Sequence, residues 1–125
     1  MAAGRELMIL VAGPYRSGTD GDPDLIEANV AAMVAASLEL YRRGHLPVMG
    51  EWFALPLIEA AEAEGDADAY GEMFHPLAER VLARCDACLR IGGASDGADR
   101  MVRFARELGK IVYTSLDEVP AADGG

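Results

Sequence analysis

The chain has 125 residues, 51% of them hydrophobic, and a formal net charge of −10 at pH 7. This length and composition fit one globular domain and exclude a disordered chain or two full-sized domains. The acidic balance argues against a DNA or RNA partner, because a protein that binds phosphate backbones needs a basic face.

The first predicted element is a strand over residues 6–13, ELMILVAG. A continuous apolar run that ends in turn residues is typical of a strand buried on both faces of a sheet. The run is too short to span a membrane, and the residues before it do not read as a signal peptide. We therefore expect a cytoplasmic protein with no membrane partner.

A polar loop, PYRSGTDGDP, leads to a helix predicted from about Asp22 to Arg43, with Asp22 and Pro23 as a favourable cap and first turn. Gly44 ends this helix, and LPVMG (46–50) is predicted to be the second strand. The predicted inward-facing stripe of the helix consists of Ile26, Val30, Met33, Val34, Ser37, Leu38 and Tyr41.

The segment after the second strand is less regular. One helix is predicted around Leu57–Glu64, and an acidic turn follows it. Pro76 is expected in the first turn of a further helix, HPLAERVLARC, because proline is tolerated there. ACLRIG is then the third strand.

IGGASDGADRMVRFARELGK (91–110) is predicted as a strand end, a Gly/Ser/Asp loop and a helix that ends at Leu108-Gly109. KIVYTS (110–115) is the fourth predicted strand. Residues 1–120 thus form one predicted domain, and residues 121–125 a flexible tail.

Cys85 and Cys88 form a CxxC pair where a predicted helix ends and a strand begins. The helix dipole has the wrong sign there to stabilise a thiolate, and neither His45 nor His75 completes a zinc site. We expect buried, inert thiols and no bound metal.

Strands that alternate with helices predict right-handed crossovers. The expected fold is therefore α/β: a three-layer Rossmann- or flavodoxin-like fold with a four- or five-stranded parallel sheet. Ligands of such sheets bind beyond the carboxyl ends of the strands. Four segments are expected at these carboxyl ends: Gly13–Asp22, Gly50–Phe53, Gly92–Asp99 and Thr114–Leu116. His45 is expected at the opposite end of the second strand.

The loop GPYRSGT offers the groups that a phosphate or a sugar would need. Gly13 and Gly18 let the backbone approach a ligand, Tyr15 offers a ring face, and Arg16 and Ser17 supply donors. The alternative is an ordinary polar turn with one arginine. Neither a P-loop nor a dinucleotide-binding motif is present.

Two further groups of residues fall at the same edge of the predicted sheet. Ser95 or Asp96 can cap the following helix, whose first N–H groups would face the cleft. Glu51 beside Trp52 would have the raised pKa that a general acid needs, and the indole, like Tyr15, could stack on a base. A solvated turn for Glu51 and simple packing for the aromatic rings remain the alternatives.

The order of these motifs resembles the nucleoside 2-deoxyribosyltransferase-like superfamily, which includes deoxyribosyltransferases and nucleoside 5′-monophosphate N-glycosidases. The resemblance covers nearly the whole chain. It rests on the GPYRSGT loop, on GEW after the second strand, and on a late pattern S-x-G-x-x-x-E-x-x-x-A. Here that late pattern reads Ser95, Gly97, Met101 and Ala105, followed by Leu-Gly-Lys.

The resemblance implies that Met101 occupies the position of the family's glutamate. A carboxylate there stabilises or captures the oxocarbenium-like centre of N-glycosidic cleavage, which a thioether cannot do. Glu51 or Asp96 are the candidate replacements, since Asp99 would face away from the cleft. Glu79 is the residue nearest to the family's second acid.

Two functions follow. The protein is either an N-glycosidase or deoxyribosyltransferase-like enzyme, or a nucleotide-binding module without turnover. The resemblance implies a nucleoside or nucleotide ligand, no cofactor, and a homodimer or higher homo-oligomer. The sequence itself adds Phe74 and the apolar stretch 52–58 as candidate interface. The expected ligand-binding residues are Gly13, Tyr15, Arg16, Ser17, Gly18, Trp52, Ser95, Gly97 and Met101.

Overall fold

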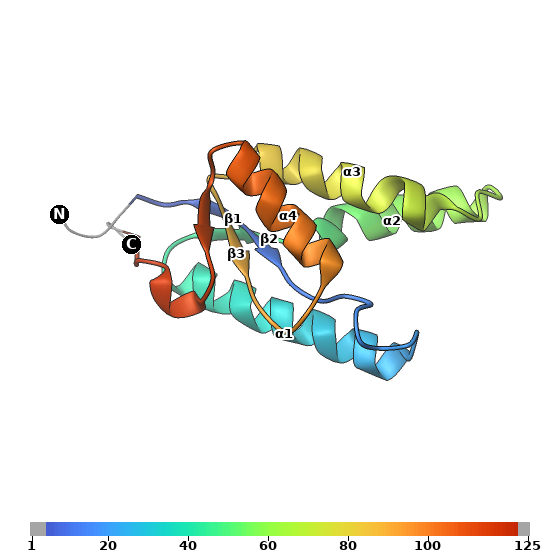
Figure 1. The fold of residues 1–125 in the computed structure, drawn as a ribbon, viewed down its shortest axis with the longest axis horizontal. Helices are drawn as coiled ribbons and strands as arrows, with labels where there is room; N and C mark the ends of the chain where they lie inside the picture. The colour runs from blue at the N-terminus through green and yellow to red at the C-terminus, as the bar shows by residue number, and fades with distance from the viewer. Residues whose placement is uncertain (1–4, 123–125) are drawn as a thin grey trace.

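The computed structural model describes residues 5–122, which form a parallel sheet with the strand order β2-β1-β3-β4. This confirms the expected α/β fold, with four strands (Figure 1). In chain order the elements are β1 (Met8–Ala12), α1 (Pro23–Arg42), β2 (Leu46–Val48), α2 (Gly50–Ala63), α3 (Ala69–Ala83), β3 (Ala87–Arg90), α4 (Asp96–Glu107), β4 (Ile111–Tyr113) and the short 3₁₀ helix η1 (Leu116–Glu118).

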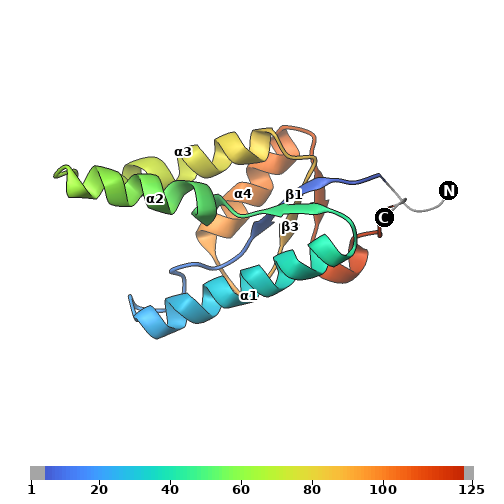
Figure 2. The same cartoon turned by 180° about the vertical axis from the view of Figure 1, so that it is seen from behind.

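The elements form three layers. Helix α1 and η1 cover one face of the sheet, and α3 and α4 cover the other (Figures 1 and 2). Successive side chains of a strand point to opposite faces. In β1, Ile9 therefore packs in the cluster with Met33 of α1, whereas Leu10 packs in the cluster with Leu82 and Val102. Both faces of β1 are covered, which explains its unbroken apolar sequence.

Helix α1 begins and ends as predicted, but its buried face is narrower. The Asp22 side chain accepts a hydrogen bond from the Asp24 N–H, and Gly44 follows the helix with φ of +92°. Only Met33, Ser37 and Leu40 of the helix are buried. These residues follow the i, i+4, i+7 spacing of one face. The predicted inward residues Val34, Leu38 and Tyr41 are exposed, so that part of the stripe was wrong.

The crossover from β2 to β3 is a hairpin of two long helices, α2 and α3, whose tip projects beyond the sheet (Figure 1). The expected strand over 46–50 ends at Val48, and both helices begin earlier than predicted. Pro56 lies inside α2, and Pro76 lies inside α3 instead of in a first turn. The prediction failed because packing between helices supplies most helical stability and outweighs the local cost of proline.

Gly50 allows the start of α2 to approach α3 closely. A Cβ atom built on Gly50 would lie 2.9 Å from the Cβ of Ala78, closer than real Cβ atoms approach one another. A glycine at this position therefore sets the distance between the two helices. The next residue, Glu51, is consequently held close to α3.

The two cysteines are buried and form no disulfide, as expected. Burial raises the pKa of Cys85 to about 11 and that of Cys88 to about 12, so both thiols stay protonated. Within residues 5–122 no cluster of side chains suits a metal ion, and no helix is long and apolar enough to cross a membrane.

His45 has a structural role at the amino-terminal edge of the sheet. Its Nδ1 accepts a hydrogen bond from the Leu7 N–H at 3.0 Å, and its Nε2 lies 2.6 Å from the Pro120 carbonyl oxygen. Ala122, which falls in the predicted tail, is held in place because its N–H donates to the Arg43 carbonyl at 2.7 Å. Residues 123–125 of that predicted tail lie outside the described residues.

Candidate functional site

A cavity of about 190 Å³ lies at the carboxyl end of β1. Strand order reverses between β1 and β3, and this is where open parallel sheets bind their ligands. Three of the four expected segments contribute to the lining, but Thr114–Leu116 does not. Helix α3 contributes a fourth part of the wall that the sequence did not predict.

Arg16 lies against an aromatic wall. Its guanidinium is 3.9 Å from the centre of the Tyr70 ring and 5.8 Å from that of Tyr15. A cation over a ring face is held by the ring quadrupole, which keeps the charge at the cavity without a carboxylate partner. The loop itself is tied down by Asn29, whose Nδ2 donates to the Tyr15 carbonyl at 2.9 Å.

The arginine loop and the start of α4 meet across the cavity. The Ser17 hydroxyl donates to the Ser95 hydroxyl at 3.1 Å, and Ser95 accepts from the Ala98 N–H at 3.1 Å. Ser95 is therefore the helix cap, and the first turn of α4 contributes Gly97 to the cavity lining. Two hydroxyls, a guanidinium and a helix N-terminus are groups that hold a phosphate or a sugar hydroxyl.

Three stacked aromatic rings form one wall. The ring centres of Tyr70 and Phe74 are 5.1 Å apart, and those of Tyr15 and Phe74 are 6.1 Å apart. Tyr70 and Phe74 are four residues apart, so they share one face of α3. The sequence contained this spacing, but it was missed because no helix was predicted before residue 75. Phe74, which the sequence offered as a candidate interface residue, is thus part of the cavity wall.

Glu51 is the acidic side chain of the cavity lining, and it is only 7% exposed. Burial raises the pKa of its carboxyl group, and a hydrogen bond with its own backbone lowers it by a smaller amount. The pKa of Tyr70 is raised by burial and by the charge of Glu51, whereas Arg16 lowers it. The carboxyl, the phenol and the guanidinium therefore interact within one site.

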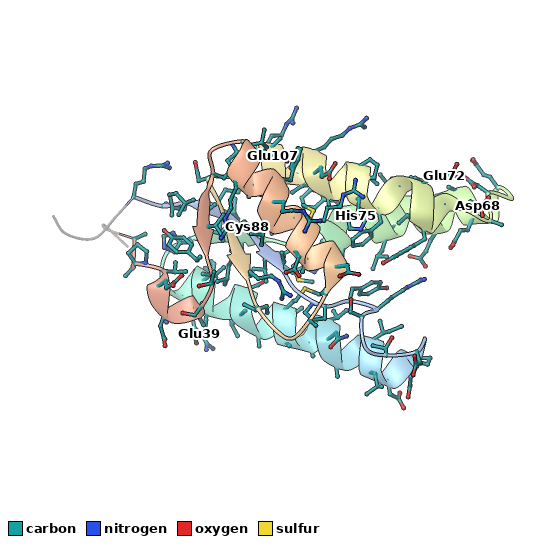
Figure 3. All side chains as sticks on the ribbon, in the orientation of Figure 1. Glu39, Asp68, Glu72, His75, Cys88 and Glu107 are labelled. Carbon is teal, nitrogen blue, oxygen red and sulfur yellow. The ribbon has the colours of Figure 1, made fainter. Side chains whose placement is uncertain are left out.

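His75 of α3 is the second titratable group that sequence reasoning missed at this site (Figure 3). Its ring packs edge-on against Phe74, with ring centres 5.5 Å apart, and a Cβ built on Gly97 would lie 3.2 Å from its Cε1. Within residues 5–122 its buried Nδ1 atom has no hydrogen-bond partner. Burial lowers the pKa of the imidazole and Arg100 lowers it further, whereas Glu79 raises it by a smaller amount, so the site favours the neutral ring.

Three predicted site residues do not line the cavity. Trp52 is 47% exposed, because successive helical residues point about 100° apart and Glu51 already points inward. Asp96 is exposed at the start of α4, since Ser95 takes the capping position instead. Gly18 is exposed in the loop with φ of +75°, where it shapes the turn rather than the cavity.

The remaining candidate acids are engaged elsewhere. Asp99 pairs with Arg90 at 3.1 Å and, as expected, does not line the cavity. Glu79 pairs with Arg100 at 3.0 Å outside the cavity lining. Met101 is buried and lines the cavity.

No protein-family model matches the chain, and no curated protein matches it in sequence. The chemistry of the site is therefore argued from its own residues. A buried carboxyl, a neutral imidazole, one guanidinium and a flat aromatic wall converge on a cavity of small-metabolite size. This set of groups suits acid–base chemistry on a ligand with a planar ring and an anionic or hydroxylated part.

Proposed function

We propose that the cavity binds a nucleoside or nucleoside 5′-monophosphate and cleaves its N-glycosidic bond. The cleavage passes the sugar either to water or to a second base. One observation carries the proposal: the buried Glu51 carboxyl lines the same cavity as the Arg16 guanidinium and the Tyr15–Tyr70–Phe74 wall. Without Glu51 the same cavity would suit binding alone.

The lining suggests how such a ligand lies. Ser17, Ser95 and the first turn of α4 suit the phosphate or the sugar hydroxyls, with Arg16 as the countercharge. The aromatic wall suits the flat face of a base. The cavity is smaller than the roughly 300–1,000 Å³ of sites for drug-sized ligands, which favours one nucleoside unit over a dinucleotide.

The two titratable groups supply the two proton transfers that hydrolysis needs. The raised pKa of Glu51 lets its carboxyl group donate a proton to the leaving base as the bond from C1′ to nitrogen breaks. The lowered pKa of His75 leaves a neutral imidazole that accepts a proton from the attacking water as the bond from oxygen to C1′ forms. Exchange of protons with solvent then restores both groups.

A nucleotide-binding module without turnover is the second candidate, and Met101 favours it. Its thioether occupies the position at which the resemblance implies a nucleophilic or stabilising carboxylate. A thioether provides no charge for an oxocarbenium-like centre. The cavity would then keep its binding groups and recognise the ligand without cleaving it.

A single panel separates the two candidates. The protein is incubated with nucleosides, 2′-deoxynucleosides and their 5′-monophosphates, and free base is measured by chromatography alongside the ligand-induced change in Tm. Release of base supports the enzyme. A rise in Tm without release supports the binding module. Neither release nor a change in Tm with any member of the panel contradicts both.

A further inference from the structure

A second hollow, here called the hairpin groove, lies between α2 and α3. It has a volume of about 320 Å³, and its floor is formed by Met8, Phe53, Leu57, Leu77 and Val81. Phe53 and Leu57 are 44% and 50% exposed, which is a large exposure for neighbouring apolar side chains. Exposed apolar patches of this kind mark surfaces that bind other proteins.

The base of the helical hairpin carries positive charge beside this groove. Arg80 and Arg84 line the groove, and both are exposed. In the part of the chain that the structure describes, neither guanidinium forms an ion pair. Two arginines at the edge of an apolar groove favour a partner with acidic groups beside an apolar surface.

The tip of the same hairpin carries the opposite charge. Glu64, Asp66, Asp68 and Glu72 gather there, and Figure 3 shows Asp68 and Glu72 at the free end of the hairpin. These carboxylates repel one another, since the charge of Asp66 raises the pKa of Glu72. Among residues 5–122 no cation pairs with any of the four.

One acid of the tip lies on the same side of α2 as the groove. Phe53, Leu57 and Glu64 are spaced i, i+4 and i+11, which places them on one side of the helix. The 14 residues of α2 span about 21 Å, so the charged ends are separated by roughly that length. A surface that is positive at one end, apolar in the middle and negative at the other is complementary to its own copy turned by 180°.

We propose that a second copy of this chain occupies the hairpin groove, and that the two hairpins pack antiparallel about a two-fold axis. Phe53 and Leu57 of both copies meet at the centre. Arg80 and Arg84 of each copy then lie against the acidic tip of the other. The sequence predicted an oligomer with residues 52–58 as a candidate interface. This inference adds the groove side of α3, the antiparallel orientation and the charge pairs, and it does not depend on the proposed function.

The first test removes the apolar centre. Sedimentation equilibrium of the full chain should show a dimer, and Leu57→Glu should raise its dissociation constant by about 30-fold or more, the effect of losing a central apolar anchor. Leu38→Glu is the matched control, because Leu38 of α1 is similarly exposed at 47%. A wild type that stays monomeric up to about 100 μM overturns the proposal. So does a dimer that Leu38→Glu weakens and Leu57→Glu does not.

The second test reverses the charges. Arg80→Glu/Arg84→Glu makes both ends of the hairpin acidic, and Glu64→Lys/Asp66→Lys/Asp68→Lys/Glu72→Lys makes both ends basic. Each variant alone should be monomeric because like charges then face each other, and an equimolar mixture should form a heterodimer. Arg103→Glu/Arg106→Glu on α4 is the control for the arginine variant: it changes the net charge by the same amount and should remain a dimer.

Circular dichroism melts confirm that each variant is folded before its mass is measured. The charge-reversal test does not depend on the stability of the Leu57 variant. Its decisive sample is the equimolar mixture, in which two variants that are monomeric alone should form a heterodimer. Two variants that each still self-associate as tightly as the wild type overturn the antiparallel arrangement. A mixture that stays monomeric also overturns it.

Discussion

Helix α3 lines two unlike hollows at successive points along its length, first the cavity and then the hairpin groove. Tyr70, Phe74 and His75 contribute to a cavity lining that also contains hydroxyl, guanidinium and carboxyl groups. Further along the helix, Leu77 and Val81 contribute to an almost wholly apolar floor with arginines at its edge. The two parts belong to one helix and differ in chemistry because they cover different neighbours.

The comparison teaches how to distinguish a ligand site from a protein-binding surface. The cavity is small, and its titratable groups have pKa values shifted by burial, as acid–base chemistry requires. The groove has no comparable buried titratable group, and its charges remain unpaired within the described chain. Variants in the cavity should therefore leave association through the groove intact, and variants in the groove should leave ligand binding in the cavity intact.

The largest expected effect is on turnover, through Glu51→Gln. Removing the proton donor should lower base release by about 100-fold or more, the usual contribution of a general acid. Ligand binding and the dimer should be retained, because the amide keeps the size of the side chain. Glu59→Gln, an exposed change on the same helix, is the control. Equal loss of activity in both variants would contradict the assignment.

The next effect concerns the aromatic wall and compares Tyr15→Ala with Trp52→Ala. Tyr15 stacks beside the cavity, whereas Trp52 is exposed on the other side of α2. Loss of one base-stacking ring costs about 1–3 kcal/mol, so Tyr15→Ala should weaken nucleotide binding by about 5- to 150-fold. Isothermal titration calorimetry measures this directly. If Trp52→Ala weakened binding as much, the position of the ligand would be wrong.

A smaller effect is expected from Ser95→Ala, which removes the cap of α4. The variant should lose about 1 kcal/mol in free energy of unfolding, as for other helix caps, because the Ala98 N–H loses its acceptor. Urea unfolding measures the change. Ser115→Ala is the control, since Ser115 precedes η1 without a side-chain capping bond and should cost little. Equal losses in the two variants would mean that the cap contributes nothing.

The smallest expected effect is on the pH dependence of stability. The pKa of Glu51 is raised in the folded protein, so the folded state binds its proton more tightly and stability falls as pH rises from 4.5 through the folded pKa. Glu51→Gln lacks this penalty. It should therefore be more stable than the wild type at pH 7, on the order of 1 kcal/mol, and should show no such gain below pH 4.5.

Thermal melts of Glu51→Gln and the wild type across this pH range measure the difference. His75 acts in the opposite direction, because its lowered pKa removes stability as pH falls below 6.5. The test therefore compares the two proteins at each pH, so that the contribution of His75 cancels. A gain that persists unchanged at pH 4 would mean that the charge of Glu51 is not its cause.

Much of the fold could be predicted because its signals are local. The apolar run of β1, the Asp22 cap of α1 and the Ser95 loop before α4 each follow from a few neighbouring residues. The order of strands and helices then placed the arginine loop and the Ser95 loop at one edge of the sheet. Their hydroxyls do meet there, 3.1 Å apart.

The hairpin of α2 and α3 could not be predicted by the same reasoning. Pro56 and Pro76 are local signals for a helix start, yet each lies within a helix that its partner stabilises. This error affected three predictions. The Tyr70–Phe74 pair and His75 were not predicted as cavity residues, and Trp52 was predicted as one although it does not line the cavity. Neighbouring residues of a helix point about 100° apart, so a helix missed at Glu51 and Trp52 leaves the direction of both side chains unpredicted.

By itself the sequence determined the parallel α/β architecture, the edge of the sheet that holds the site, and Glu51 as a candidate acid, because apolar period, caps and chain order are local properties. Tertiary structure alone decided which side chains share the cavity and which pKa values shift. Burial and the packing of α3 on α2 and α4 depend on residues far apart in the chain. For the same reason, only the folded hairpin shows an apolar groove with positive charge at its base and negative charge at its tip.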